Sequence, residues 1–290
     1  MITLPRPLGA RAERWIVGAS GPAPASAPTS ARLRLFCFPN AGGTAGTYAG
    51  WRPHLPPGLS LLPVELPGHG ARGHEDLAQD LEELAARALA ALSGELDHPY
   101  ALFGHSFGGL LAFEIARRIE REGLPAPRAV LVSAVRPPHL PKANPAATAD
   151  DNQLLDWLVA SGGLPEELLR HTAYLGRLLR CLRTDLTMAE RYQPPGPAPL
   201  AAPLHVLGGL EDPVAPLEDL SDWIDWEGEA PFSTSLFPGG HSYLFDHPQP
   251  LLNHLATLLL TPPTPPPPTP PPPTPPPPTP PPPTPSLPTP

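Results

Sequence analysis

The stretch from Tyr100 to Ile119, YALFGHSFGGLLAFEIARRI, constrains the fold of this chain more than any other. A short apolar run, typical of a buried strand, leads into Gly104-His105-Ser106-Phe107-Gly108, and an amphipathic helical pattern follows at once. Strand, G-x-S-x-G and helix in this order are the context of a nucleophile elbow, a sharp turn that presents a serine above a sheet. The pattern therefore predicts Ser106 at the tip of such a turn, and a glycine-rich turn with an incidental serine is the alternative.

Strand and helix patterns alternate along most of the chain. This alternation predicts an α/β fold with a mostly parallel central sheet flanked by helices, and the turn at Ser106 narrows it to the α/β-hydrolase fold. The expected strands are 32–38, 59–66, 100–103, 128–134, 204–207 and 233–237, with an edge strand at 15–17, and the expected helices are 47–55, 77–92, the run after Ser106, 150–160, 166–192, 215–226 and 249–260.

The alternation breaks between about residues 140 and 195, where helical patterns occur without a strand. We expect this insertion to form a helical lid over an active site, with two extra structural helices as the alternative. Residues 262–290 repeat four prolines and a threonine, a composition that forms extended structure and no core. The expected organisation is one hydrolase domain over 1–261, with its lid at about 140–195, and a disordered or extended Pro/Thr-rich tail over 262–290.

Charge and cysteine content exclude several classes of protein. The formal net charge is −9 and no basic run occurs, which argues against a nucleic-acid partner. The two cysteines form no disulfide framework, no signal-peptide pattern begins the sequence, and no apolar run reaches membrane-spanning length. Metal-binding motifs and clustered metal ligands are missing from the sequence, so no metal or cofactor is expected. We expect a soluble, cytoplasmic monomer.

A nucleophilic serine needs a base, usually a histidine that is oriented by a carboxylate. In α/β-hydrolases the chain order is serine, acid, histidine. His241 follows the last expected strand on a Gly-Gly loop, and Asp212 follows the strand before it, so the predicted triad is Ser106, Asp212 and His241. Glu211 is an adjacent alternative acid. Weaker candidates are Asp246, which follows the histidine, His205 within a strand, and His247 and His254 near the terminal helix.

Two backbone amides are predicted to form an oxyanion hole. One is the amide of Phe107, which follows the serine at the start of a helix. The other comes from the loop Asn40-Ala41, which follows the expected strand 32–38, and Ala41 is the favoured donor. The predicted chemistry is acyl transfer through a serine ester.

With these residues in place, the chain resembles the type II, or editing, thioesterases of polyketide and nonribosomal peptide assembly lines. The resemblance implies hydrolysis of aberrant or stalled acyl thioesters on the phosphopantetheine arm of acyl or peptidyl carrier proteins, as in antibiotic biosynthesis. It carries the catalytic triad onto Ser106, Asp212 and His241. The matching segments are LFCFPNAGGTAGTY (35–48), VELPGHGAR (64–72), YALFGHSFGGLLAFEIAR (100–117), VLVSAVRPP (130–138), LRTDLTMAERY (182–192), LGGLEDPV (207–214) and FPGGHSYL (237–244).

Three positions depart from the pattern of this family. The family usually has histidine in place of Asn40, methionine in place of Phe107, and often arginine in place of His69. None of these removes a triad member. A carboxylesterase acting on small esters and a non-catalytic binding protein on a hydrolase fold are the alternatives.

Carrier proteins are acidic, as this chain is, so their approach requires a local basic patch. Arginines of the expected lid are the candidates, and ordinary solvated helix faces are the alternative. They are Arg170, Arg177, Arg180, Arg183 and Arg191.

Overall fold

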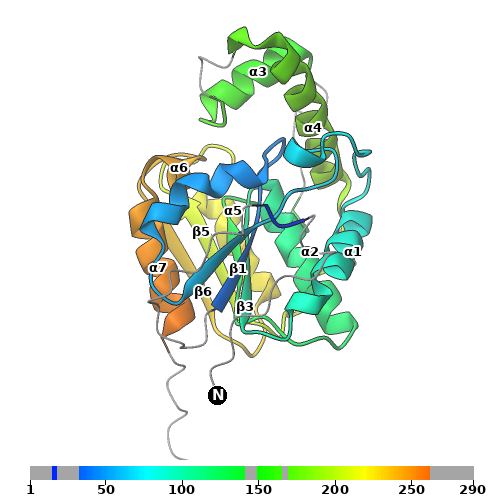
Figure 1. Ribbon diagram of the computed structural model, residues 1–290. Coiled ribbons are helices and arrows are strands. Elements are labelled where there is room, and N and C mark those ends of the chain that lie inside the picture. Colours follow the sequence, from blue (N-terminus) through cyan, green and yellow to red (C-terminus); the bar gives the residue numbers. More distant parts are fainter. Residues whose placement is uncertain (1–14, 18–32, 141–148, 165–168, 262–290) are drawn as a thin grey trace, which may run out of the picture.

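A six-stranded parallel sheet forms the centre of the protein in the computed structural model, which describes residues 15–17, 33–140, 149–164 and 169–261 (Figure 1). The strand order is β2-β1-β3-β4-β5-β6, and every neighbouring pair is parallel. The six central strands expected from the sequence are thus confirmed, with small differences at their ends. The proline-rich tail and residues 141–148 and 165–168 of the expected lid lie outside the described residues. The strands are β1 (Leu33–Phe38), β2 (Leu59–Pro63), β3 (Tyr100–His105), β4 (Val130–Ser133), β5 (Leu204–Gly209) and β6 (Phe232–Phe237).

Ile16, within the expected edge strand, forms one antiparallel bridge with Val64 beyond the end of β2. The six strands otherwise follow one another through helical crossovers, as parallel neighbours require.

Alternating side chains of the strands enter two separate cores. On β1, Phe36 and Phe38 belong to the core that also holds the inner faces of α1 (Leu81–Leu92) and α2 (Phe107–Arg121). Leu35 and Cys37 point the other way, into a core shared with η2 (Ala45–His54) and α7 (Pro248–Leu260). The period of two in a strand therefore buries both faces of the sheet.

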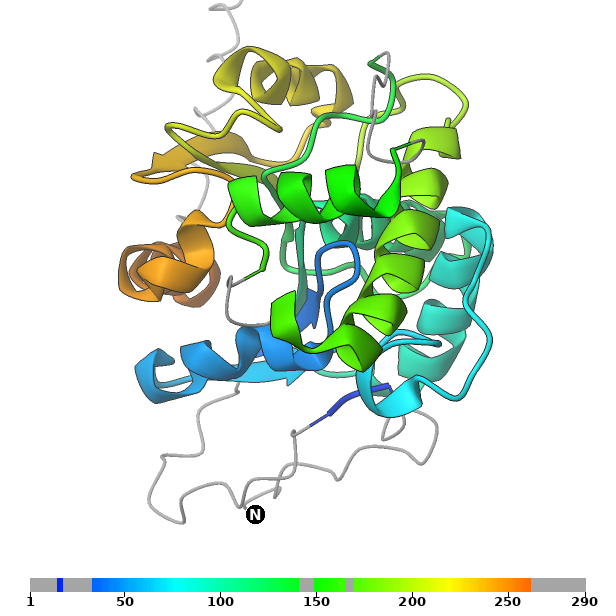
Figure 2. The same ribbon diagram turned by 90° about the horizontal axis from the view of Figure 1, so that it is seen from above.

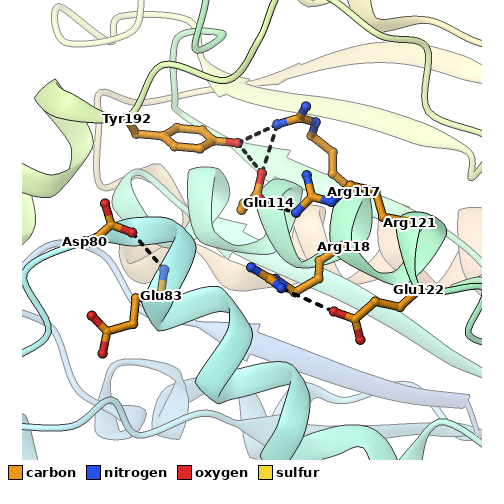
Figure 3. Close-up of polar contacts among 8 residues, drawn as sticks. All are labelled: Asp80, Glu83, Glu114, Arg117, Arg118, Arg121, Glu122 and Tyr192. Carbon is orange, nitrogen blue, oxygen red and sulfur yellow. Dashed lines mark hydrogen bonds and ion pairs between the residues drawn. The ribbon is translucent and has the colours of Figure 1, made fainter.

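Helix α1 begins four residues later than the sequence pattern suggests. The side chain of Asp80 accepts a hydrogen bond from the amide of Glu83 at 2.8 Å, which caps the first turn (Figure 3). Such a cap satisfies an amide that has no partner within the helix. Leu77, the expected first residue, instead packs against the turn at Gly68.

Two helices, α3 (Asp151–Ala160) and α4 (Thr172–Arg191), separate β4 from β5 and are called the cap below. Figure 2 shows them crossing above the end of the sheet at which the loop after β1 emerges. Between β5 and the end of α7 lie three short helices, α5 (Leu217–Ser221), η7 (Asp222–Trp226) and α6 (Tyr243–Asp246). None of the helices in the described ranges has the length and apolar character needed to span a membrane.

The last turn of the cap is fixed to α2 by a buried polar cluster (Figure 3). Glu114 of α2 is fully buried and accepts hydrogen bonds from Arg117 at 2.9 Å and Arg121 at 2.8 Å. The hydroxyl of Tyr192, at the end of α4, donates to the same carboxylate at 2.7 Å. Because loss of one partner would leave a buried charge uncompensated, the cluster fixes α4 against the helix that begins at Ser106.

Backbone contacts at two glycines bring three elements together. A Cβ atom on Gly104 would lie 1.9 Å from the carbonyl oxygen of Gly108, so β3 and the first turn of α2 have no room for a side chain between them. A Cβ on Gly108 would lie 2.2 Å from the carbonyl oxygen of Phe38 at the end of β1. The turn at Ser106 therefore depends on glycine at both positions.

We expect Gly104→Ala to lower the free energy of unfolding by about 3 kcal/mol or more, because the new methyl group meets backbone that cannot rotate away. Gly94→Ala is the matched control, since no atom lies within 4 Å of its added Cβ, and its effect should stay within about 0.5 kcal/mol. Urea denaturation of the three proteins measures both values, and equal stability of Gly104→Ala and wild type would contradict the steric argument.

Candidate active site

Ser106 occupies a strained turn between β3 and α2. Its backbone dihedral angles are φ 54° and ψ −121°, and only one other non-glycine residue in the described ranges, Ala134, has a positive φ. Its amide is held by the carbonyl oxygen of Ser133 at 2.8 Å. A strained conformation of this kind persists only where surrounding contacts impose it. The geometry is that of the elbow predicted from the sequence.

Two amides beside this turn have no hydrogen-bond acceptor among the described residues: those of Phe107 and Ala41. Phe107 opens α2, where the first amides of a helix lack internal partners and favour negative charge. Ala41 lies just beyond β1, which pairs directly with β3, so both amides come from the same edge of the sheet. They are the two donors predicted for an oxyanion hole, a role that stays a prediction.

His241 and Asp212 meet on the loops that follow β6 and β5. The Nδ1 atom of His241 lies 2.9 Å from Oδ2 of Asp212, and both residues are buried. Burial alone would raise the pKa of Asp212, but the bond to His241 and the amides of Val214 and Ala215 lower it below its ordinary value. Since the ionised carboxylate can only accept, Nδ1 carries the proton and Nε2 is left to accept one.

The histidine lies next to the elbow. The rings of His241 and His105 are 5.0 Å apart, centroid to centroid. In the described structure the hydroxyl of Ser106 and the imidazole of His241 form no hydrogen bond. Catalytic hydrogen bonds often tighten only when substrate is bound.

Two further contacts hold the His241 loop. The Glu211 carboxylate accepts a hydrogen bond from the Gly239 amide at 2.7 Å, so this alternative acid supports the loop and is not bonded to the histidine. The hydroxyl of Ser242 donates to the carbonyl oxygen of Ser161 at the end of α3, at 2.9 Å. The cap therefore touches the loop that carries the predicted base.

The other histidines near the sheet have different partners. His105 lies 2.9 Å from the hydroxyl of Ser133, and its complete burial lowers its pKa well below the usual range, so it is neutral. His205 is bonded to Ser233 at 2.7 Å, and burial lowers its pKa to about 4. Each of these two histidines is thus bonded to a serine hydroxyl of a neighbouring strand.

A second histidine–aspartate pair was not predicted. Nε2 of His69 lies 2.9 Å from Oδ2 of Asp185 on α4, and the same oxygen accepts a hydrogen bond from the amide of Gly42 at 2.8 Å. Burial alone would lower the pKa of His69, but the Asp185 carboxylate raises it to about 11. One signal was present: Asp185 interrupts the apolar face of α4 that Leu178 and Leu182 begin.

No group of three or more side chains suited to hold a metal ion occurs among the residues that the structure describes. The expectation that the protein needs no metal or cofactor stays a prediction.

A parallel sheet with a strained serine turn at its edge and a histidine–aspartate pair on the following loops defines the class of α/β-hydrolases. Residues 33–259 match the model of the thioesterase domain family, and the chain belongs to that family.

Similar proteins come from natural-product pathways. The chain is 34% identical over 260 residues to the thioesterase PikA5 of Streptomyces venezuelae, over 88% of this chain and 89% of that protein. Its fold matches RedJ, a thioesterase from the prodiginine biosynthetic pathway in Streptomyces coelicolor, with a TM-score of 0.73, 38% identity and coverage of 88% and 97%. BorB, a type II thioesterase from the borrelidin biosynthetic cluster, matches with a TM-score of 0.74, 32% identity and coverage of 84% and 97%.

We expect Asp212→Asn to lower kcat by about 10³–10⁴-fold with little change in fold, because an amide no longer holds the imidazole in the required tautomer. Steady-state hydrolysis of an acyl thioester measures the loss, and circular dichroism checks the fold. A loss below about tenfold would exclude Asp212 as the acid. Glu211→Gln is the matched control, since that carboxylate binds only the neighbouring loop.

The same variant tests the lowered pKa of Asp212. A carboxylate whose pKa is lower in the folded state stabilises the fold at pH values above its ordinary pKa of 3.8. This contribution is lost as the pH falls through the lower pKa of the folded state. The difference in unfolding free energy between wild type and Asp212→Asn should therefore be largest near neutral pH and shrink below pH 3.8. Chemical denaturation at several pH values measures it, and a difference that grows in acid would contradict the assignment.

Proposed function

We propose that this thioesterase hydrolyses acyl groups from the phosphopantetheine arm of carrier proteins, with Ser106 as nucleophile, His241 as base and Asp212 as its orienting acid. The observation that supports this most is the strained Ser106 turn, which lies beside two amides without acceptors. The membership of the thioesterase family then favours a thioester over an oxygen ester as the substrate.

The first half of the reaction forms an acyl-enzyme. Oγ of Ser106 attacks the thioester carbonyl while Nε2 of His241 takes its proton, and Asp212 stabilises the imidazolium that results. Negative charge collects on the carbonyl oxygen, where the amides of Ala41 and Phe107 donate hydrogen bonds. Such a donor contributes about 10²–10³ in kcat. The C–S bond then breaks, and the thiol of the arm leaves with the proton from His241.

Water completes the cycle. His241 takes a proton from water, the hydroxide attacks the acyl ester on Ser106, and the same two amides hold the second oxyanion. The serine recovers its proton from His241 as the carboxylic acid leaves. These steps require no other group.

The biological role that fits best is editing: the removal of aberrant or stalled acyl groups from an assembly line. BorB carries the name of a type II thioesterase, and RedJ comes from a biosynthetic pathway for a natural product. These names support a role for this chain as a thioester hydrolase that serves a polyketide or nonribosomal peptide pathway.

The exposed arginines of α4 and of the residues just before it are the docking surface that we propose for an acidic carrier protein. Arg170, Arg177 and Arg180 are exposed, and none forms an ion pair with another described residue. Arg183, by contrast, is occupied by the carbonyl oxygen of Ala149 and by Asp151. In a chain of net charge −9, a local group of exposed arginines on the cap favours the approach of an acidic partner.

The substrate class is tested by comparing one acyl group on three carriers: a phosphopantetheinylated carrier protein, a free pantetheine thioester and a simple oxygen ester. We expect kcat/KM to be highest for the carrier-bound thioester and to vanish with Ser106→Ala. A clear preference for the oxygen ester would identify a carboxylesterase. Unchanged hydrolysis by Ser106→Ala would exclude the mechanism, and no hydrolysis by wild type would favour a binding protein.

The docking surface is tested by the double variant Arg177→Glu/Arg180→Glu. We expect KM for the carrier-bound substrate to rise about tenfold at low salt, with kcat and the hydrolysis of free pantetheine thioester unchanged. Arg128→Glu is the control. This exposed arginine lies just before β4, at the end of the sheet opposite to the one that carries Ser106. An equal rise in KM with the control would show a general charge effect without a specific surface.

A further inference from the structure

The second histidine–aspartate pair links the cap to the loop of the proposed oxyanion hole. Asp185 belongs to α4 and is completely buried, and its Oδ2 accepts hydrogen bonds from both His69 and Gly42. Its other carboxylate oxygen has no partner among the described residues. Burial of a carboxylate costs free energy unless the charge is compensated. An apolar residue would be the ordinary choice on that face of α4, so the carboxylate of Asp185 indicates a role other than packing.

The side chain of His69 is the positively charged partner of Asp185. Its Nδ1 lies 3.0 Å from the carbonyl oxygen of Pro67, and its Nε2 lies 2.9 Å from Asp185. Both partners can only accept, so both ring nitrogens carry protons and the imidazole is positively charged. No lone pair remains for proton transfer, which excludes His69 as a second base.

The contact between Gly42 and Asp185 fixes one peptide group of the loop after β1. Gly42 has a positive φ of 69°, which glycine adopts freely. The conformational preference of glycine therefore does little to fix the peptide group between Ala41 and Gly42. The bond from its amide to Asp185 fixes that plane, one residue after the free amide of Ala41. The amide of Gly43 closes the turn onto the carbonyl oxygen of Asn40 at 2.8 Å. The direction of the Ala41 amide therefore depends on a carboxylate from α4.

We propose that Asp185, which bonds both His69 and the amide of Gly42, is a positioning residue that keeps the oxyanion-hole loop in its working geometry and makes that geometry depend on the cap. This inference rests on the proposed function, since it takes Ala41 as an oxyanion donor. Asp185 touches neither substrate nor reacting atoms and acts only through Gly42.

Asp185→Ala tests the proposal, with Tyr192→Phe as the matched control. Both changes remove a buried hydrogen bond that fixes α4, but Tyr192 binds Glu114 on α2 and not the loop. We expect Asp185→Ala to lower kcat by about 10–100-fold with KM within about threefold, because a misplaced donor weakens only the transition state. Tyr192→Phe should keep kcat within about twofold of wild type, even if its thermal stability falls as much as that of Asp185→Ala.

Inhibition by a trifluoromethyl ketone analogue of the substrate adds a second readout. This compound forms a tetrahedral oxyanion on the serine, so its Ki should rise in parallel with the loss of kcat/KM in Asp185→Ala. A folded Asp185→Ala enzyme with wild-type kcat would overturn the proposal, as would an equal fall in kcat with Tyr192→Phe.

Asp185→Asn keeps the test decisive if the alanine variant fails to fold. Its amide oxygen can still accept from Gly42 but no longer compensates the charge of His69, and we expect kcat to fall about threefold to tenfold. Wild-type kcat in this variant would overturn the part of the inference that assigns a role to the charge pair with His69, since the acceptor for Gly42 is kept. Failure of the proposed function is a separate result, since wild type would then hydrolyse no carrier-bound thioester at all.

Discussion

Backbone-to-backbone contact at Gly104 and Gly108 is the constraint on which the proposed site depends. It brings the end of β3, the first turn of α2 and the end of β1 together with no side chain between them. Ser106 and the two free amides therefore belong to one rigid unit, built on hydrogen-bonded strands. Catalytic groups on such a unit need no reorganisation as charge develops, which is the main source of electrostatic stabilisation in acyl transfer.

The cap helices are bonded to the loops beside this unit. The first cap helix holds the His241 loop through Ser161, and the second holds the Gly42 loop through Asp185. The end of α4 is also fixed to α2 by Tyr192. A movement of all of α4 would break buried polar contacts at two points, and a movement of the end of α3 would break the bond between Ser242 and Ser161.

The sheet and the predicted triad could be derived from sequence because their signals are local. Each strand is a short apolar run, and Asp212 and His241 each follow such a run in the order that the fold requires. The sequence pattern predicts the start of α1 too early. Leu77 fits the apolar spacing of the helix, but the N-cap Asp80 makes the helix begin at Leu81. Helix 215–226 was expected to be continuous, but it divides into α5 and η7.

The pair of His69 and Asp185 was missed because its residues lie 116 positions apart and neither belongs to a local motif. The two histidine–aspartate pairs also show why residue type alone does not define a base. His241 gives Nδ1 to Asp212 and, in the proposed mechanism, keeps Nε2 for substrate, whereas His69 gives both nitrogens to acceptors. An arginine, which the resemblance leads one to expect at position 69, would supply the same positive charge. What this position requires is therefore a buried cation, and histidine meets the requirement because Asp185 keeps it protonated.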